Sequence, residues 1–295
     1  MRTPKPWIWL FTLIVGARML PVIWRRAIKK MRGKPNYMSE SAPRQIPKTI
    51  WIYWDRGEAG APDLVRTCIA SWRDRNPGWE VCVLDAATAA QTVDLPQDPA
   101  AISVQSYADL LRLRLLRQRG GVWVDATAYC LAPLDEWLPP LSQMGFFAYT
   151  WIRNDRWFIW PGMRRTLTNW FIASEPQGKI VSDWEEASFD YWEGRKKPHI
   201  YYWPHVMIDY LYLTNRSFRH LFKDIPKVGC YGAHLVHDCV THGHDPKEVA
   251  ALLKIGATPV QKLRWNWSEE RIALAKELLG IEEADAVTRL DRNQA

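Results

Sequence analysis

Short apolar runs alternate with longer helical segments over the first half of the chain. The runs at 46–54, 79–84 and 122–124 are rich in β-branched and aromatic residues, which is typical of strands. The segments 62–75 and 106–119 lie between them and have the pattern of helices. Alternation of strand and helix predicts an α/β fold with a mostly parallel sheet flanked by helices. Farther along, the pattern weakens but predicts a strand at 146–150 and helices at 177–192 and 204–213.

The helical segment 106–119 is apolar in nearly every direction around its axis, and a helix of this kind is buried. Asp109 and Arg112 lie three residues apart on one face of it. Buried charges are costly unless they are paired or bound to a polar group. The two side chains therefore either pair with each other alone or bind a polar ligand. The later polar residues are expected to form the solvated end of the helix; they are Arg114, Arg117, Gln118 and Arg119.

The apolar strand at 122–124 ends in a carboxylate, Asp125, and Thr127 follows two residues later. Three successive apolar residues suit a strand that is buried on both faces. In open α/β sheets, ligands bind beyond the carboxyl ends of the strands. Asp125 is therefore placed to hold a divalent metal ion and, through it, a diphosphate. The alternative is an aspartate that only shapes the turn after the strand.

Taken together, the order Asp109-x-x-Arg112, helix, Gly120-Gly121, apolar strand, Asp125 resembles the core motif of sugar-nucleotide glycosyltransferases. In particular it is similar to the capsular polysaccharide synthesis protein family and to relatives with a DXD sugar-binding region. The resemblance implies a GT-A (Rossmann-like) fold in which Asp109 and Arg112 bind the donor sugar. It also implies that Asp125 is the first aspartate of the DXD motif and faces Mn²⁺ or Mg²⁺. Thr127 replaces the second aspartate and would complete the metal site.

Three further residues are assigned by the same resemblance. Trp54 follows the phrase Ile-Pro-Lys-Thr-Ile at 46–50, and it would stack on the nucleotide base. Asn169 precedes an apolar run and would lie near the sugar, while Lys262 would contact the diphosphate. The alternatives are a core tryptophan for Trp54 and an asparagine that starts a turn for Asn169.

Charge divides the chain into a basic N-terminal segment and a nearly neutral body. Residues 1–47 contain ten Lys and Arg but one acidic residue, so this segment carries +9 of the total charge of +7, and the remainder carries −2. A nucleic-acid-binding domain would carry its positive charge on the folded face, so that class is excluded. We expect an anchor and linker at 1–45, a catalytic domain at 46–280 and a polar tail at 281–295.

The N-terminal segment is expected to associate with a membrane. Residues 7–17 carry no charge, and a basic cluster at 25–34 follows. Eleven residues are too short to cross a bilayer alone. The segment either lies in the interface, with its basic residues on anionic lipid, or forms a single span with a basic cytoplasmic flank. A cleaved signal peptide is a third alternative. The odd number of cysteines, five, favours free thiols in a reducing compartment. We therefore expect a location at the cytoplasmic face of a bacterial inner membrane.

Histidines gather between residues 234 and 244, together with an aspartate and a cysteine. Such residues are zinc ligands in other proteins, although no paired cysteines accompany them here. Alternatively, by the resemblance, one of these histidines would complete the metal shell at Asp125.

These observations predict a glycosyltransferase of hexosyltransferase type. It would move a sugar from a nucleotide-diphosphate donor, a UDP-sugar by expectation, to a saccharide or lipid-linked acceptor in capsule or exopolysaccharide synthesis. The resemblance implies retention of anomeric configuration. The alternative is a non-catalytic GT-A-like subunit that binds or assembles other parts of the polysaccharide machinery.

Overall fold

The computed structural model describes residues 44–96, 100–151 and 167–281, with five single positions before residue 28. The described strands are β1 (Thr49–Tyr53), β2 (Glu80–Leu84), β3 (Gly121–Val124), β4 (Ala128–Cys130), β5 (Phe146–Ala148), β6 (Phe171–Ser174) and β7 (Val260–Lys262). The described helices are α2 (Asp63–Arg75), α3 (Ala86–Thr92), α4 (Val104–Arg119), α5 (Leu134–Leu141), α6 (Lys179–Trp192), α7 (Trp203–Thr214), α8 (Arg216–Asp224), α9 (Leu235–His242), α10 (Pro246–Lys254) and α11 (Glu269–Leu278), with a short 3₁₀ turn at Gly232–His234.

The central sheet has the strand order β2-β1-β3-β6-β5. β1 pairs in parallel with both β2 and β3, whereas β6 is antiparallel to both β3 and β5. Four of these five strands therefore point in one direction, which confirms the predicted mixed α/β class with a mostly parallel sheet. The reversed strand, β6, follows Asn169 and brings that residue to the edge at which β3 ends.

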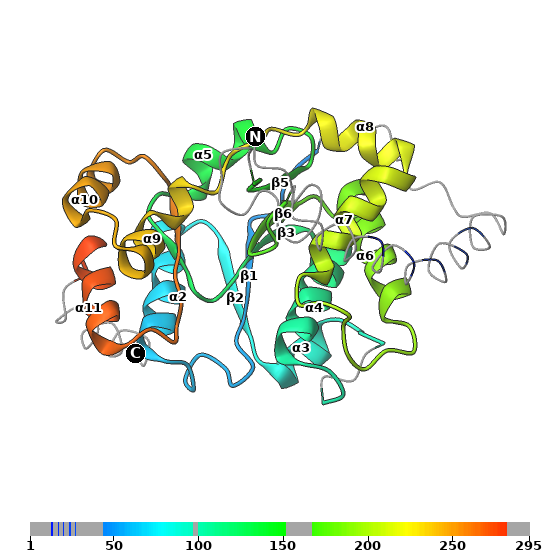
Figure 1. Ribbon diagram of the computed structural model, residues 1–295, viewed down its shortest axis with the longest axis horizontal. Coiled ribbons are helices and arrows are strands. Elements are labelled where there is room, and N and C mark those ends of the chain that lie inside the picture. The colour runs from blue at the N-terminus through cyan, green and yellow to red at the C-terminus, as the bar shows by residue number, and fades with distance from the viewer. Residues whose placement is uncertain are drawn as a thin grey trace.

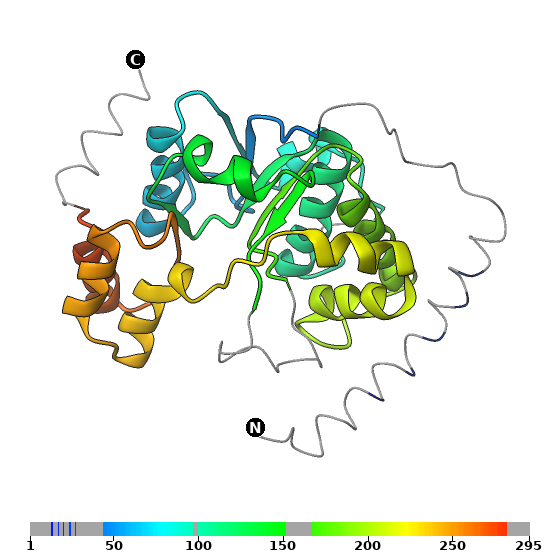
Figure 2. The ribbon, with the colours of Figure 1, turned by 90° about the horizontal axis from the view of Figure 1, so that it is seen from above.

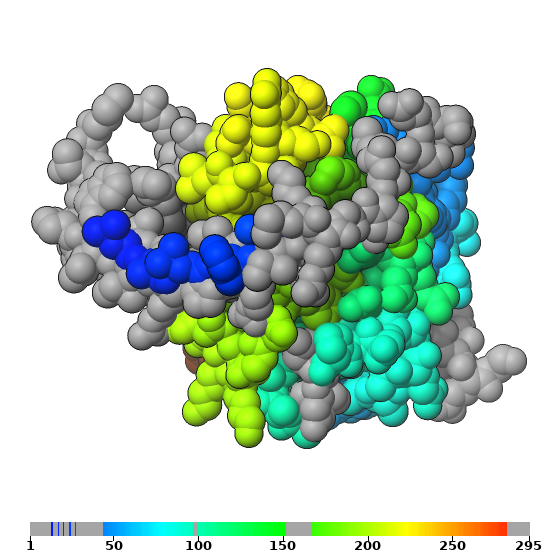
Figure 3. All heavy atoms as spheres, turned by 90° about the vertical axis from the view of Figure 1, so that its right-hand side faces the viewer, coloured from blue at the N-terminus to red at the C-terminus, as the bar shows by residue number. Residues whose placement is uncertain are grey.

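Helices cover both faces of the sheet (Figure 1). α4, α6, α7 and α8 lie on one side, and α2 lies on the other (Figure 2). Each side has its own apolar core: Trp184 and Trp192 of α6 pack in the first, and Trp72 of α2 packs in the second. Figure 3 views the side with α6 to α8, where α8 lies above α3.

The C-terminal part of the chain adds a third layer beyond α2. Helices α9, α10 and α11 pack around Leu64 and Cys68 of α2 and form a separate apolar core (Figure 1). The strand β7 from this region pairs antiparallel with β4, which directly follows the turn after β3. The pairing sets Ala128 opposite Lys262, so that residues more than 130 positions apart in sequence meet beside Asp125.

Two glycines connect α4 to β3, and the geometry of the chain requires both. Gly120 and Gly121 have φ angles of 67° and 98°, a region that other residues rarely adopt. A Cβ atom on Gly121 would lie 2.5 Å from the carbonyl oxygen of Thr49 on the neighbouring strand β1. The pair therefore allows the chain to turn sharply and lets β3 pack closely against β1.

Helix α4 is buried, as its leucine-rich pattern predicts. All five leucines between positions 110 and 116 are at most 1% exposed. The prediction for the helix end is wrong in part. Gln118 and Arg119 are exposed, but Arg114 and Arg117 turn toward α6 and pair with Glu185, which is itself 1% exposed. The sequence did not reveal this pairing because Glu185 lies about 70 residues away along the chain.

The predicted N-terminal anchor and most of the polar tail lie outside the described residues. Among the helices that the structure does describe, none is long and apolar enough to cross a membrane. The five cysteines are all described, and each is a free thiol, as expected from their odd number.

Candidate functional site

Helix α4 and strand β3 bring three charged side chains together at the carboxyl edge of the sheet. Arg112 lies between two carboxylates: its Nη1 is 3.1 Å from Oδ1 of Asp109, and its Nη2 is 3.4 Å from Oδ1 of Asp125. Its guanidinium carbon also lies 4.9 Å from the ring centre of Trp123. Asp109 and Arg112 therefore do pair, as one interpretation predicted, but the pair also extends to the strand-end carboxylate.

Asn169 joins this group from the segment before β6. Its side-chain amide nitrogen donates to Oδ1 of Asp109 at 2.8 Å, and its backbone carbonyl oxygen accepts from Nη1 of Arg112 at 2.6 Å. Arg112 also donates through Nε to the carbonyl oxygen of Ala108. Because the guanidinium has several fixed partners, its orientation is held by both α4 and the β6 segment. Asn169 thus lies beside Asp109 and Arg112, and its side chain contacts Asp109.

Burial changes the acid–base behaviour of Asp109. Asp109 is only 9% exposed. The loss of solvation raises the pKa of its carboxyl to about 7. The charge of Asp125 reinforces this shift, whereas the charge of Arg112 opposes it. The carboxyl of Asp109 therefore gains or loses its proton near neutral pH. A buried carboxyl with such a pKa is a feature of functional sites.

Lys262 approaches the carboxylate of Asp125 at the oxygen that Arg112 does not contact. Its Nζ lies 3.5 Å from Oδ2 of Asp125, and it donates a hydrogen bond to the hydroxyl of Thr127. Leu263 N–H donates to the carbonyl oxygen of Thr127 at 2.8 Å, which holds the two segments together. Asp125 therefore lies between two cations, Lys262 and Arg112, in an arrangement that suits binding of a polyanion such as a diphosphate.

The residues of this edge also fit a divalent cation. Asp125 and Thr127 supply oxygen atoms, the ligand type that Mg²⁺ and Mn²⁺ prefer. One carboxylate is sufficient when water and substrate phosphates complete the shell. The Nζ atom of Lys262 contacts both residues in this structure.

Trp54 lies at the carboxyl end of β1, the strand next to β3. It is half-buried, and its ring meets that of Trp265 edge-on, with ring centres 5.9 Å apart. Trp265 is 48% exposed and follows Lys262 by three residues. The sequence analysis did not single out Trp265; its position close behind Lys262 was the available signal.

An exposed tyrosine, Tyr201, lies just before α7. The residue is 69% exposed, and the pKa of its hydroxyl is raised by partial burial and by the charges of Asp109 and Asp125. Trp203, which follows two residues later, is 1% exposed and belongs to the apolar core.

Among the clustered histidines, His234 contacts Trp170, the residue after Asn169. Its Nδ1 is 2.9 Å from the carbonyl oxygen of Cys230, so Nδ1 carries the proton in the neutral ring. Burial lowers the pKa of His234 to about 4, with His237 and Lys262 as smaller causes, and the hydrogen bond with the carbonyl oxygen of Cys230 opposes this shift. The ring lies 5.8 Å from that of Trp170, whose carbonyl oxygen accepts a hydrogen bond from the N–H of Asp125.

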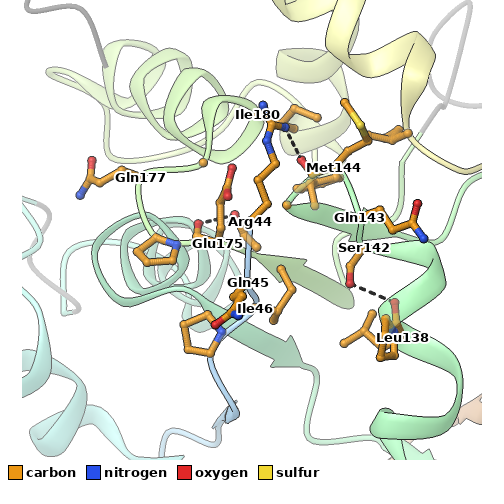
Figure 4. Close-up of a pocket in the computed structure, with 18 of the residues that line it drawn as sticks. Arg44, Gln45, Ile46, Leu138, Ser142, Gln143, Met144, Glu175, Gln177 and Ile180 are labelled. Atoms are coloured by element: carbon orange, nitrogen blue, oxygen red, sulfur yellow. Dashed lines mark hydrogen bonds between the residues drawn. The ribbon is translucent and has the colours of Figure 1, made fainter. Parts of the chain in front are cut away.

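A cavity of about 1040 Å³ lies at the opposite edge of the sheet. It is lined by the segment before β1, including Arg44, and by the segment after β6, including Glu175 (Figure 4). Because β6 runs against the other strands, its end and the start of β1 meet at the amino edge. The cavity is therefore distinct from the group around Asp125, and burial raises the pKa of Glu175 within it.

The fold and this charged group define an α/β protein with a candidate anion-binding site at the carboxyl edge of its sheet. Comparison with known families identifies one that matches most of the chain. The family model described as capsular polysaccharide synthesis protein matches residues 23–277, which is most of the chain. The protein belongs to this family, as its motif predicted.

Three curated relatives are similar over shorter regions. O-glycosyltransferase braB of Annulohypoxylon truncatum is 26% identical over 175 residues, which cover 52% of this chain and 39% of the relative. Initiation-specific alpha-1,6-mannosyltransferase of Candida albicans is 26% identical over 46% of this chain and 40% of its own length. Glycosyltransferase afumC of Aspergillus fumigatus is 25% identical over 50% of this chain and 41% of its own length. The chain thus spans about two fifths of the length of the curated relatives it matches.

Two solved structures are similar at lower identity. PaToxG glycosyltransferase has a TM-score of 0.40 at 15% identity, and the match covers 90% of both chains. The apo form of the glycosyltransferase GlyE from Streptococcus pneumoniae has a TM-score of 0.46 at 10% identity. That match covers 85% of this chain and 64% of the GlyE chain.

Proposed function

We propose that the protein is a glycosyltransferase with a GT-A type of domain. It would transfer a sugar from a nucleotide-diphosphate donor, of which a UDP-sugar is our first candidate, to a saccharide or lipid-linked acceptor. The observation that carries the proposal is the convergence of Arg112 and Lys262 on Asp125, next to the pair formed by Asp109 and Asn169. Membership of the capsular polysaccharide synthesis family and relatives named glycosyltransferases support it.

In this proposal, the α4 side of the site orients the donor sugar. Sugar hydroxyls both donate and accept hydrogen bonds, so they require acceptors and donors at fixed positions. The carboxylate of Asp109 supplies acceptors, and the guanidinium of Arg112 supplies donors. The hydrogen bonds from Asn169 and to its carbonyl oxygen hold both groups in place before the donor arrives. Such preorganisation reduces the entropy lost when the reacting sugar is aligned.

The Asp125 side of the site would act on the leaving group. When the bond between sugar and diphosphate breaks, negative charge develops on the diphosphate, and cations placed there stabilise the transition state. Lys262 and Arg112 provide two such cations. Mn²⁺ or Mg²⁺ held by Asp125 and Thr127 would add Lewis-acid assistance to the same leaving group.

Retention of anomeric configuration follows from the proposed geometry if the acceptor attacks on the face from which the diphosphate departs. The acceptor hydroxyl then loses its proton to the leaving diphosphate, so no side chain is assigned as the general base. Trp54 would stack on the nucleotide base, with Trp265 against its edge; such stacking contributes about 1–3 kcal/mol per base. The exposed ring of Tyr201 is a candidate platform for the acceptor sugar, because aromatic faces suit the apolar side of a sugar ring.

The cellular setting is also a proposal. The basic N-terminal segment would hold the protein at the cytoplasmic face of a bacterial inner membrane, where nucleotide sugars and lipid-linked acceptors meet. Its charge of +9 over residues 1–47 contrasts with −2 over the rest of the chain. Attraction to anionic lipid would therefore come from this segment alone.

Asp125→Ala provides the decisive test. The full chain is first screened by thermal shift against a panel of nucleotide sugars, with and without Mn²⁺. The donor that stabilises it is then incubated with saccharide acceptors, and released nucleotide diphosphate is measured. We expect Asp125→Ala to lower turnover by at least ~100-fold, since the variant loses the carboxylate that positions both cations.

An exposed aspartate on α5, Asp135, serves as the matched control. Asp135→Ala should keep wild-type turnover, and circular dichroism should show that both variants are folded. Near-wild-type turnover by Asp125→Ala would refute the assigned role. The second candidate, a non-catalytic binding or assembly subunit, is favoured by Thr127 in place of a second carboxylate. It predicts donor binding in the thermal-shift screen but no release of nucleotide diphosphate with any donor and acceptor pair.

A further inference from the structure

Helix α9 carries a second group of metal-ligating side chains outside the proposed donor site. His237, Asp238 and His242 each offer one ligand atom, and these atoms all lie within 4.8 Å of one another. Within the part of the chain that the structure describes, no other group of three His, Cys, Asp or Glu side chains has such spacing. All three residues come from one short helix, so the group does not depend on how distant segments are packed.

Two of the ligand atoms are already about as far apart as two ligands of one bound ion. Nδ1 of His237 lies 3.0 Å from Oδ1 of Asp238. Two ligands at zinc distances of about 2.0–2.1 Å in tetrahedral geometry are about 3.4 Å apart. A zinc ion could therefore replace the hydrogen that the two atoms now share, with the imidazole proton carried on Nε2. His242 is exposed on the next turn of the helix, and a change of its rotamer would complete the approach.

The surroundings restrain His237 and leave one side of the group open. The His237 side chain is 14% exposed and that of Asp238 is 7% exposed. The His237 ring has neighbouring rings on several sides, with centres at 5.8 Å for His242 and Trp267 and 5.9 Å for His234. A ligand whose rotamer is already restricted loses less entropy on binding, and the exposed His242 leaves a path for the ion to enter.

We propose that His237, Asp238 and His242 form a zinc-binding site on α9, with water as the fourth ligand. Two imidazoles and one carboxylate are the ligand set that zinc accepts, whereas Mg²⁺ and Mn²⁺ prefer oxygen ligands. The site therefore differs in preference from the oxygen donors Asp125 and Thr127. The chain would then bind zinc at α9 and Mg²⁺ or Mn²⁺ at Asp125 and Thr127.

The zinc site would support the proposed donor site from a distance. The N–H of Val236 donates to Oε1 of Gln261 at 2.9 Å, and Nε2 of Gln261 donates to the carbonyl oxygen of Gly232 at 2.8 Å. Gln261 directly precedes Lys262. Zinc that stabilises α9 therefore also stabilises the segment that positions Lys262. This consequence rests on the proposed function, but zinc binding itself does not.

Zinc titration of the full chain tests the proposal. The protein is treated with EDTA, exchanged into buffer with a non-thiol reductant, and titrated with zinc chloride in competition with a chromophoric chelator. We expect one zinc per chain, unaffected by millimolar Mg²⁺, and an increase in the melting temperature of about 5 °C at a zinc concentration ~100 times Kd. His242→Ala should weaken binding by at least ~30-fold because one of three protein ligands is lost.

Two control variants separate this site from other causes. His220→Ala removes an exposed histidine from α8 and should bind zinc as the wild type does. Asp125→Ala should also keep zinc binding, even where it loses transfer activity, so that failure of the proposed function leaves this result unchanged. His237→Gln gives a second ligand variant in case His242→Ala is poorly folded. Wild-type affinity in both ligand variants, or loss of zinc binding in Asp125→Ala, would overturn the proposal.

Discussion

Arg112 connects most of the polar groups of the candidate site. One guanidinium contacts Asp109, Asp125 and the backbone of Asn169, and lies over Trp123. Arginine suits this position because its planar fork presents several donors at fixed angles and stays charged at all physiological pH values. A lysine would supply the charge without the fixed directions. The organisation of the site thus depends on a single residue type at position 112.

The raised pKa of Asp109 predicts a pH dependence of activity. The carboxyl titrates at about 7 and accepts hydrogen bonds best when ionised. We expect kcat/KM for the donor to rise with pH through about 7 in the wild type. Asp109→Asn should have low activity without this rise, because its amide does not titrate. A pH–rate profile of both proteins checks this, and an identical rise in Asp109→Asn would assign the titration to another group.

The same shift affects stability with a definite sign. The folded-state pKa of Asp109 is above its unfolded value of about 3.9, so the folded protein binds more protons in between. Its contribution to the free energy of unfolding therefore falls as the pH rises from about 4 to 7 and is constant above that range. The free energy of unfolding is measured in urea at pH 5 and at pH 8. The difference between these two values should be smaller in Asp109→Asn than in the wild type. An unchanged difference would contradict the buried, titrating carboxyl.

At the scale of elements, α4 is held by charge as well as by its leucines. Glu185 of α6 is 1% exposed and pairs with both Arg114 and Arg117. Once the chain folds, these three charges are largely removed from water and depend on one another. The pair of helices therefore combines an apolar contact with a buried ionic one. This contact orients α4, which carries Asp109 and Arg112 in its middle turns.

Removal of Glu185 should destabilise this helix pair. Glu185→Ala leaves two half-buried guanidinium groups without their shared carboxylate, and we expect a loss of about 3 kcal/mol in the free energy of unfolding. Arg114→Ala should cost less, because Glu185 keeps Arg117. Glu136→Ala on the exposed surface of α5 is the matched control and should change stability by less than about 0.5 kcal/mol. Denaturant unfolding measures all three, and equal losses for Glu185→Ala and Glu136→Ala would refute the structural role.

On the scale of the whole molecule, charge is divided between two parts of the chain. The N-terminal segment carries the excess of basic residues, and the rest of the chain is close to neutral. We expect the full chain to bind vesicles with anionic lipid and to leave them as salt increases, because each basic residue near the surface contributes about 1 kcal/mol. The body alone provides no comparable attraction.

A set of four substitutions in the basic cluster tests this division. Arg25→Ser, Arg26→Ser, Lys29→Ser and Lys30→Ser together should weaken binding to anionic vesicles by at least ~100-fold in a sedimentation assay. Lys247→Ser and Lys254→Ser on α10 change the charge of the body and should leave binding as in the wild type. Equal affinity of the full chain for neutral and anionic vesicles would contradict the electrostatic part of the anchor.

Local patterns in the sequence determined much of this protein. The helix α2, the buried helix α4 and the short strand β3 were predictable because periodicity, apolar runs and Gly120-Gly121 are properties of neighbouring residues. The motif from Asp109 to Asp125 was predictable for the same reason, and it led to the family that the comparison confirms. The division of charge required only the order of the residues.

Tertiary structure alone decided which distant residues meet. The reversed direction of β6 brings Asn169 to Asp109, and the pairing of β4 with β7 brings Lys262 to Asp125 and Thr127. The pairing of Glu185 with α4 and the contact of Trp265 with Trp54 also join residues far apart in the sequence. Local periodicity contains no information on these contacts, because they depend on how whole elements pack to bury their apolar faces and pair their charges.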